Sequence, residues 1–136
     1  MYIMSFSQLV GSQFGYQKRV IIPTFPANPS SSNFITVASV PLAGGLWIVN
    51  VNSIEFACDN YPTGKMNNMR QQIVYDGVIR DRASIIGTAI YGCELSSIAV
   101  IKTDGVTPVV IQLQGQTTDT STFTVDSGFA TFTRLY

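Results

Sequence analysis

Alternation of apolar and polar residues over short runs is the dominant pattern in this chain of 136 residues. Gly, Pro, Asn and Asp separate the runs, which β-branched and aromatic side chains fill, while the helix formers Glu and Lys are scarce. A period of two is typical of strands with one buried face. The pattern predicts an all-β chain, an antiparallel two-sheet sandwich of eight to nine strands, as in a jelly roll.

The expected strands form an open first half and a second half of hairpins. In the first half we expect strands at 18–23, 34–40 and 46–58, with an extended loop at 24–33. In the second half we expect hairpins of 69–75 with 83–93, 96–103 with 109–114, and 121–125 with 129–136. Asp104-Gly105 marks the clearest of the turns, because Asp-Gly tolerates the positive φ angles of a type I′ turn.

Charged residues are unusually few, which changes the expected character of the surface. Only 16 of the 136 residues are charged, which is 12% against about one-quarter in typical soluble domains. The formal net charge is zero. A domain with so little solvating surface is expected to hide part of it against copies of itself or inside a larger particle.

The residue inventory argues against an enzyme. The chain contains no histidine, which excludes Ser/His and Cys/His nucleophile pairs and zinc sites that need imidazole. The eight carboxylates show no spacing that indicates a catalytic dyad. Asp59, Asn60 and Asp119 offer oxygens for calcium but lack the Asp-x-Asp spacing of calcium loops. We therefore expect no catalytic activity, no cofactor and no metal.

Charge, hydropathy and cysteine usage give expectations about nucleic-acid binding, membrane spans and disulfide bonds. The basic residues are scattered, so we expect no nucleic-acid binding. No apolar run approaches the length of a membrane span, and the first residues do not resemble a signal peptide. Cys58 and Cys93 could pair, although two buried free thiols are the favoured interpretation.

The aromatic residues have two possible roles. Most lie inside expected strands, where core packing or a subunit interface is favoured over a carbohydrate platform. For the core or a trimer interface we single out Trp47, Phe129, Phe132 and Tyr136. A ligand-binding loop is the alternative, and its candidate residues are Asn60, Tyr61 and Asp119.

Two stretches resemble a known family. Val40-Pro-Leu-Ala-Gly-Gly-Leu-Trp-Ile-Val-Asn-Val51 is similar to its Leu-Pro-x-Gly-x-aromatic-x-Val entry into a long strand, with a double glycine replacing the usual single one. The end, Ser127 to Tyr136, resembles its closing strand. The family is the C1q/TNF-like jelly roll of trimeric heads in viral and bacteriophage structural proteins. The resemblance implies a compact homotrimer with aromatic residues along the threefold axis, and a place in the virion.

Residues 1–33 are expected to differ from the β-sandwich domain at 34–136. They are rich in aromatic residues and are punctuated by Pro and Ser. Two interpretations stay open: an arm that docks on a neighbouring capsid or tail subunit and becomes ordered there, or a first strand followed by a long loop. The docking residues would be Tyr2, Phe6, Phe14 and Tyr16.

The leading functional hypothesis is a non-enzymatic virion structural protein, namely a trimeric subunit of capsid decoration (cement) or of a spike head. Its partners would be copies of itself and capsid or tail proteins of the same virion. The alternative is a receptor- or carbohydrate-binding module at the tip of a phage tail fibre, with a host surface glycan as its partner.

Overall fold

The computed structural model describes residues 15–22, 25–27, 34–58, 66–88, 92–116 and 123–136. These residues contain nine β-strands and no helix, which confirms the predicted all-β sandwich. The strands are β1 (Gln17–Ile22), β2 (Phe25–Ala27), β3 (Ile35–Val40), β4 (Gly45–Cys58), β5 (Met66–Tyr75), β6 (Val78–Thr88), β7 (Gly92–Thr103), β8 (Val109–Gln116) and β9 (Phe123–Arg134).

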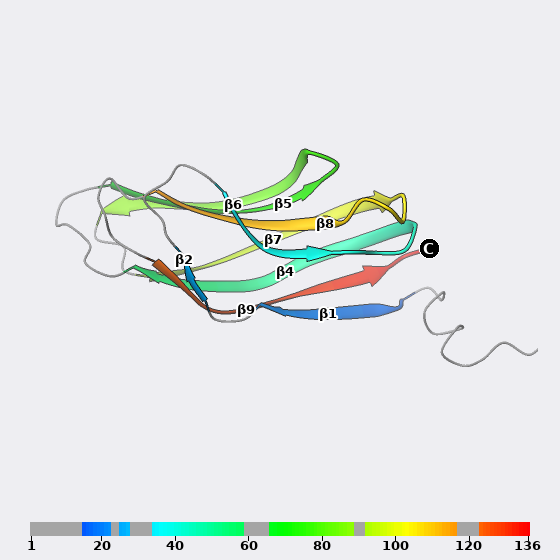
Figure 1. Ribbon diagram of the computed structural model, residues 1–136, viewed down its shortest axis with the longest axis horizontal. Coiled ribbons are helices and arrows are strands. Elements are labelled where there is room, and N and C mark those ends of the chain that lie inside the picture. Colours follow the sequence, from blue (N-terminus) through cyan, green and yellow to red (C-terminus); the bar gives the residue numbers. More distant parts are fainter. Residues whose placement is uncertain (1–14, 23–24, 28–33, 59–65, 89–91, 117–122) are drawn as a thin grey trace, which may run out of the picture.

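The strands form two antiparallel sheets that face each other as layers (Figure 1). The five-stranded sheet has the order β1-β9-β4-β7, with β2 also paired to β9, and the four-stranded sheet has the order β3-β8-β5-β6. Apart from β2, the pairs are nested: β1 with β9, β3 with β8, β4 with β7 and β5 with β6. This nesting is the winding of a jelly roll.

The hairpin at Asp76-Gly77 is confirmed, and both turn residues have positive φ angles of 53° and 73°. The hairpin expected at Asp104-Gly105 is wrong, because β7 pairs with β4 while β8 pairs with β3 and β5 in the other sheet. A local turn signal cannot distinguish a hairpin from a crossing between sheets.

Three other boundaries differ from expectation. The residues expected to form one strand at 83–93 belong to two strands, the end of β6 and the start of β7. The hairpin expected between 121–125 and 129–136 is wrong, because residues 126–128 lie inside the single strand β9, which pairs with β1 and β2 on one side and with β4 on the other. A register shift opposite Glu55 and Phe56 absorbs the extra residue. The expected loop at 24–33 contains the short strand β2, which pairs with β9.

The core lies between the sheets and is set by alternation along the strands. In β4 the buried positions are Trp47, Val49 and Val51, and a register shift after Val51 then brings Ile54 inward as well. Without this bulge, every later residue of β4 would face the opposite side. Gly128 lies opposite Ile54, and a Cβ there would come within 2.8 Å of the Ser53 carbonyl oxygen.

The Asp104 carboxylate organises the turn between β7 and β8. It accepts hydrogen bonds from the backbone N–H groups of Val106 (2.8 Å) and Thr107 (2.7 Å) and from the Thr107 hydroxyl (2.8 Å). These bonds, the Thr107 backbone bond above all, hold the pKa of Asp104 well below its usual range. The Asp104 N–H donates to the Tyr75 hydroxyl (2.8 Å), which joins the turn to β5 of the four-stranded sheet.

Truncation of a core aromatic should destabilise the fold strongly. Phe132 is fully buried, so Phe132→Ala should lower the free energy of unfolding by about 3–5 kcal/mol through lost burial and a residual cavity. Tyr136 is 72% exposed, and Tyr136→Ala should change it by less than about 0.5 kcal/mol. Urea unfolding measures both, and equal losses for the two variants would contradict this packing.

Removal of the Asp104 charge should destabilise the protein in a pH-dependent manner. The folded pKa lies below the unfolded value of about 3.9. The resulting stabilisation is therefore present at neutral pH and is lost as pH falls through about 4 toward the folded pKa. Asp104→Asn should have a lower urea midpoint than the parent at pH 7, and the gap should close in acid. Asp76→Asn, in the β5–β6 turn, controls for loss of one acidic charge, and an equal pH-dependent gap there would contradict the assignment.

Candidate functional site

The outward side of the five-stranded sheet carries rows of apolar, hydroxyl and amide side chains. One row across the sheet consists of Gln17, Thr133, Ile48 and Val100. The next row consists of Arg19, Thr131, Asn50 and Ile98. Ile21 and Phe129 pair at the β1 end of the sheet. We call these two rows and this pair the outer apolar face.

Large apolar side chains stand out from this face. Ile21 is 72% exposed, Ile98 57% and Val100 60%. Three polar side chains of the face have hydrogen-bond partners: the Gln17 amide donates to the Thr133 hydroxyl (3.1 Å), and the Thr131 hydroxyl donates to the Asn52 amide oxygen (3.1 Å). Exposed apolar groups are unfavourable in water, and polar groups that already have partners lose little free energy when a partner surface covers them.

The charged group within the outer apolar face is partly neutralised by packing. The Arg19 guanidinium lies 4.2 Å from the centroid of the Phe129 ring, a cation–π arrangement. Arginine stacked in this way carries a weakly hydrated charge and tolerates an interface better than lysine does. The face therefore offers no strong barrier of like charge to a partner.

The same apolar character continues around the edge where β6 and β7 meet. On β6, Val78, Ile79 and Ile85 are exposed. The Ile98 N–H of β7 donates to the Asp81 carboxylate of β6 (2.9 Å), so a carboxylate caps part of the edge of the five-stranded sheet. Within the five-stranded sheet, β7 forms one edge and β1, which carries Ile21, forms the opposite edge.

The outward side of the four-stranded sheet is different, since amides and arginines occupy it. Arg82 Nε donates to the Gln72 amide oxygen (2.8 Å), and Gln72 Nε2 donates to the Gln112 amide oxygen (3.4 Å). Arg70 lies opposite Ser84, diagonal to Arg82 on the neighbouring strand. No carboxylate of the described residues forms an ion pair with either arginine. The outer side of the four-stranded sheet is thus the more polar of the two, although Val74 and Val110 also pair on it.

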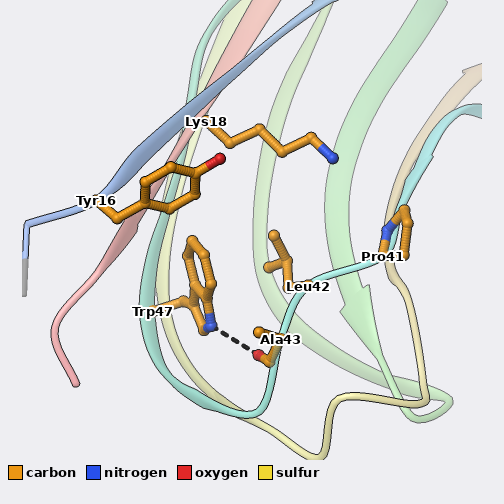
Figure 2. Close-up of a pocket in the computed structure, with 6 residues that line it drawn as sticks. All are labelled: Tyr16, Lys18, Pro41, Leu42, Ala43 and Trp47. Carbon is orange, nitrogen blue, oxygen red and sulfur yellow. Dashed lines mark hydrogen bonds between the residues drawn. The ribbon is translucent and has the colours of Figure 1, made fainter. Parts of the chain in front are cut away.

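A cavity of about 250 Å³ lies beside the connection between β3 and β4 (Figure 2). It is lined by Tyr16, Lys18, Pro41, Leu42, Ala43 and Trp47. The Trp47 indole N–H donates to the Ala43 carbonyl oxygen (3.0 Å), which fixes one wall. The Tyr16 ring packs edge-on against Trp47 with 6.3 Å between centroids. The cavity therefore has rigid aromatic and aliphatic walls.

The residues singled out from the sequence occupy different environments. Trp47 and Phe132 lie in the core, Phe129 is half-buried on the outer apolar face, and Tyr136 is exposed after β9. Tyr16 lines the cavity. Six candidates lie outside the described residues: Tyr2, Phe6, Phe14, Asn60, Tyr61 and Asp119.

The cysteines and metal candidates add no described site. Cys58 lies on β4 and Cys93 on β7, where the register places Cys93 opposite Phe56. The side chains of both cysteines are outside the described part. Among the described residues there is no cluster of three or more Cys, Asp or Glu suited to a metal ion, and no helix that could span a membrane.

Sequence reasoning missed the outer apolar face, although a signal for it existed. The run Ile98-Ala99-Val100-Ile101 is continuously apolar, as are Leu46-Trp47-Ile48-Val49 and Val20-Ile21-Ile22. Strands covered on both faces show such runs, whereas strands with one wet face alternate. These three runs lie on three strands of the same sheet. No sequence pattern indicated the cavity, because the residues that line it are far apart in the sequence.

Comparison with known proteins identifies the fold. No protein-family model matches the chain, and no curated protein matches it. A structure of infectious bursal disease virus, Gx strain, superposes with a TM-score of 0.53 at 12% identity over 87% of this chain. Eiger TNF from S. frugiperda superposes with a TM-score of 0.50 at 9% identity, over 82% of this chain and 69% of Eiger. The chain spans 33% of the length of the viral protein. At such identities, the likeness shows the jelly-roll fold.

Proposed function

We propose that this protein is a non-enzymatic structural subunit of a virus particle, which assembles as a homotrimer through its outer apolar face. Its place in the particle would be capsid decoration (cement) or a spike head. The observation that carries the proposal is the exposure of Ile21, Ile98 and Val100 on one sheet of a chain with few charges. Covering the exposed part of each such side chain stabilises a contact by about 1–2 kcal/mol, because the rest of the side chain is already buried.

The positions of the apolar surfaces favour a ring. One lies where β6 of the four-stranded sheet meets β7 of the five-stranded sheet, and the other lies at the β1 edge, so the two surfaces occupy opposite edges of the sandwich. If the first surface of one copy packs against the second surface of the next, the contact is heterologous, and heterologous contacts close into rings when the rotation permits. A ring of three copies matches the trimer that the C1q/TNF-like resemblance implies. Arg19 on Phe129 would then supply a weakly hydrated charge inside the contact.

The virion role rests on composition and fold together. Few charges and apolar runs on several strands are expected of a subunit in a large assembly. The fold is shared with a structure of infectious bursal disease virus and with a TNF protein. Of these two contexts we propose the virus particle, which is also the place that the C1q/TNF-like resemblance implies.

A second function, receptor binding at the tip of a phage tail fibre, is favoured by the polar side of the four-stranded sheet. The hydrogen bonds of the buried Gln72 fix the orientations of the exposed Arg82 and the half-buried Gln112. Arg70 adds a cation on the same side. Such a surface suits the hydroxyl and acidic groups of a host glycan. Both functions are compatible with assembly through the opposite sheet.

Assembly is tested by solution mass. Light scattering at two concentrations that differ tenfold should give three times the 14.8 kDa chain mass for the parent protein. The double variant Ile98→Lys, Val100→Lys should be monomeric, because two ammonium groups would be desolvated in the contact. Val106 is 85% exposed in the β7–β8 turn, outside the outer apolar face, and Val106→Lys should remain trimeric. A monomeric parent, or a trimeric double variant, would contradict the proposal.

The place in a particle is tested separately. Antibody raised against the purified chain should label intact virus particles whose genome encodes it, and the protein should sediment with them. The expected density of label is regular, since a cement or spike subunit occupies symmetric positions. Protein found only in the unsedimented fraction would overturn the virion role while leaving the trimer intact.

A further inference from the structure

We infer that the cavity beside the β3–β4 connection is a binding site for a small amphipathic carboxylate, an acid with a compact apolar body. The inference concerns the cavity alone and does not depend on the proposed assembly. Its apolar walls come from Pro41, Leu42 and Trp47. Its polar groups come from Tyr16 and Lys18, which lie on the same side of the cavity (Figure 2).

The polar groups of the cavity are unused in the described structure. The Lys18 ammonium forms no hydrogen bond or ion pair with any described residue, and neither does the Tyr16 hydroxyl. The Trp47 N–H, in contrast, already has the Ala43 carbonyl oxygen as its acceptor. The site therefore offers one cation and one hydroxyl to a ligand. One carboxylate would accept from both groups through charge-assisted hydrogen bonds.

Lys18 owes its position to the edge of the sandwich. Along β1, Lys18 and Val20 alternate with the exposed Gln17, Arg19 and Ile21, so Lys18 belongs to the inward set. An ammonium in that set would lie in the core if β1 were a central strand. Because β1 is the edge strand of its sheet, Lys18 borders the cavity instead and is half-buried.

The size and lining of the cavity select among acids. About 250 Å³ is below the range of drug-sized pockets, roughly 300–1,000 Å³, and suits a single ring or a branched aliphatic body. A sugar would bring several hydroxyls that need partners, and among the described side chains that line the cavity only Tyr16 and Lys18 supply free polar groups. The apolar walls therefore favour a hydrocarbon body over an acidic sugar.

Trp47 makes the site directly observable. It is the only tryptophan in the chain and lies in the cavity wall, so its emission reports on this site alone. Cyclohexanecarboxylate does not absorb where tryptophan does and carries one ring and one carboxylate. At constant ionic strength, it should change Trp47 emission saturably, with half-saturation at about 1 mM or below. Equilibrium dialysis should give one bound acid per chain.

Variants and analogues assign the roles of the groups. Lys18→Met keeps an apolar stem and removes the charge, and it should weaken binding by about ten- to a hundred-fold. Tyr16→Phe should weaken binding less. Lys102→Met removes the same charge from an exposed position outside the cavity and should bind like the parent. The neutral cyclohexanecarboxamide should bind the parent as weakly as the acid binds Lys18→Met.

The outcomes that overturn the inference are equally concrete. Absence of saturable binding by both emission and dialysis would show that the cavity is not such a site. Equal binding of acid and carboxamide, or unchanged binding by a Lys18→Met variant with parental far-UV circular dichroism, would remove the role of the cation. Tighter binding of glucuronate than of cyclohexanecarboxylate would reassign the site to an acidic sugar.

Discussion

The structure depends on one constraint, namely which side chains of β4 face the core and which face outward. This strand of 14 residues pairs with β7 on one side and β9 on the other. Its first part buries Trp47, Val49 and Val51, and only the bulge that follows allows Ile54 to be buried as well. An unbroken period of two would place Ile54 in water and a serine in the core. Gly128 leaves room for the bulged backbone on the neighbouring strand.

The alternation in β4 also separates the two surfaces to which we assign roles. Trp47 faces inward and forms a wall of the cavity, while Ile48 faces outward in a row of the outer apolar face. Adjacent residues thus serve opposite sides of one sheet. A one-residue shift in register before Val49 would turn Trp47 outward and Ile48 inward. Such a shift would destroy the core, the cavity and the outer apolar face together. The surfaces are coupled through register and share no contact residue.

The sequence predicted the sandwich well and its pairing poorly, and two Asp-Gly turns explain the difference. At Asp76-Gly77 the turn joins neighbouring strands, whereas at Asp104-Gly105 the chain passes from one sheet to the other. Both dipeptides favour a tight turn. Which strand lies next to β7 is decided by the nested pairing of strands far apart in the sequence, which no local pattern encodes. Lys18 shows the same limit for the site, because the role that we propose for it depends on the connection at 41–43, which lies beside it in space but not in sequence.

The outer sides of the two sheets differ in polarity, so each side can serve a different role in an assembly. On the carboxylate-poor side with Arg70 and Arg82, the buried Gln72 amide bonds to Arg82 and Gln112. The other side exposes Ile98 and Val100 and gains by being covered. In a ring built through the apolar side, the polar side of every copy would face away from the contacts, and three identical arginine-bearing surfaces would be displayed around one axis. Weak binding at each surface would then be multiplied by simultaneous engagement. An assembly face and a display face on opposite sheets would therefore reconcile the two proposed functions, since assembly would create the multivalency that receptor binding requires.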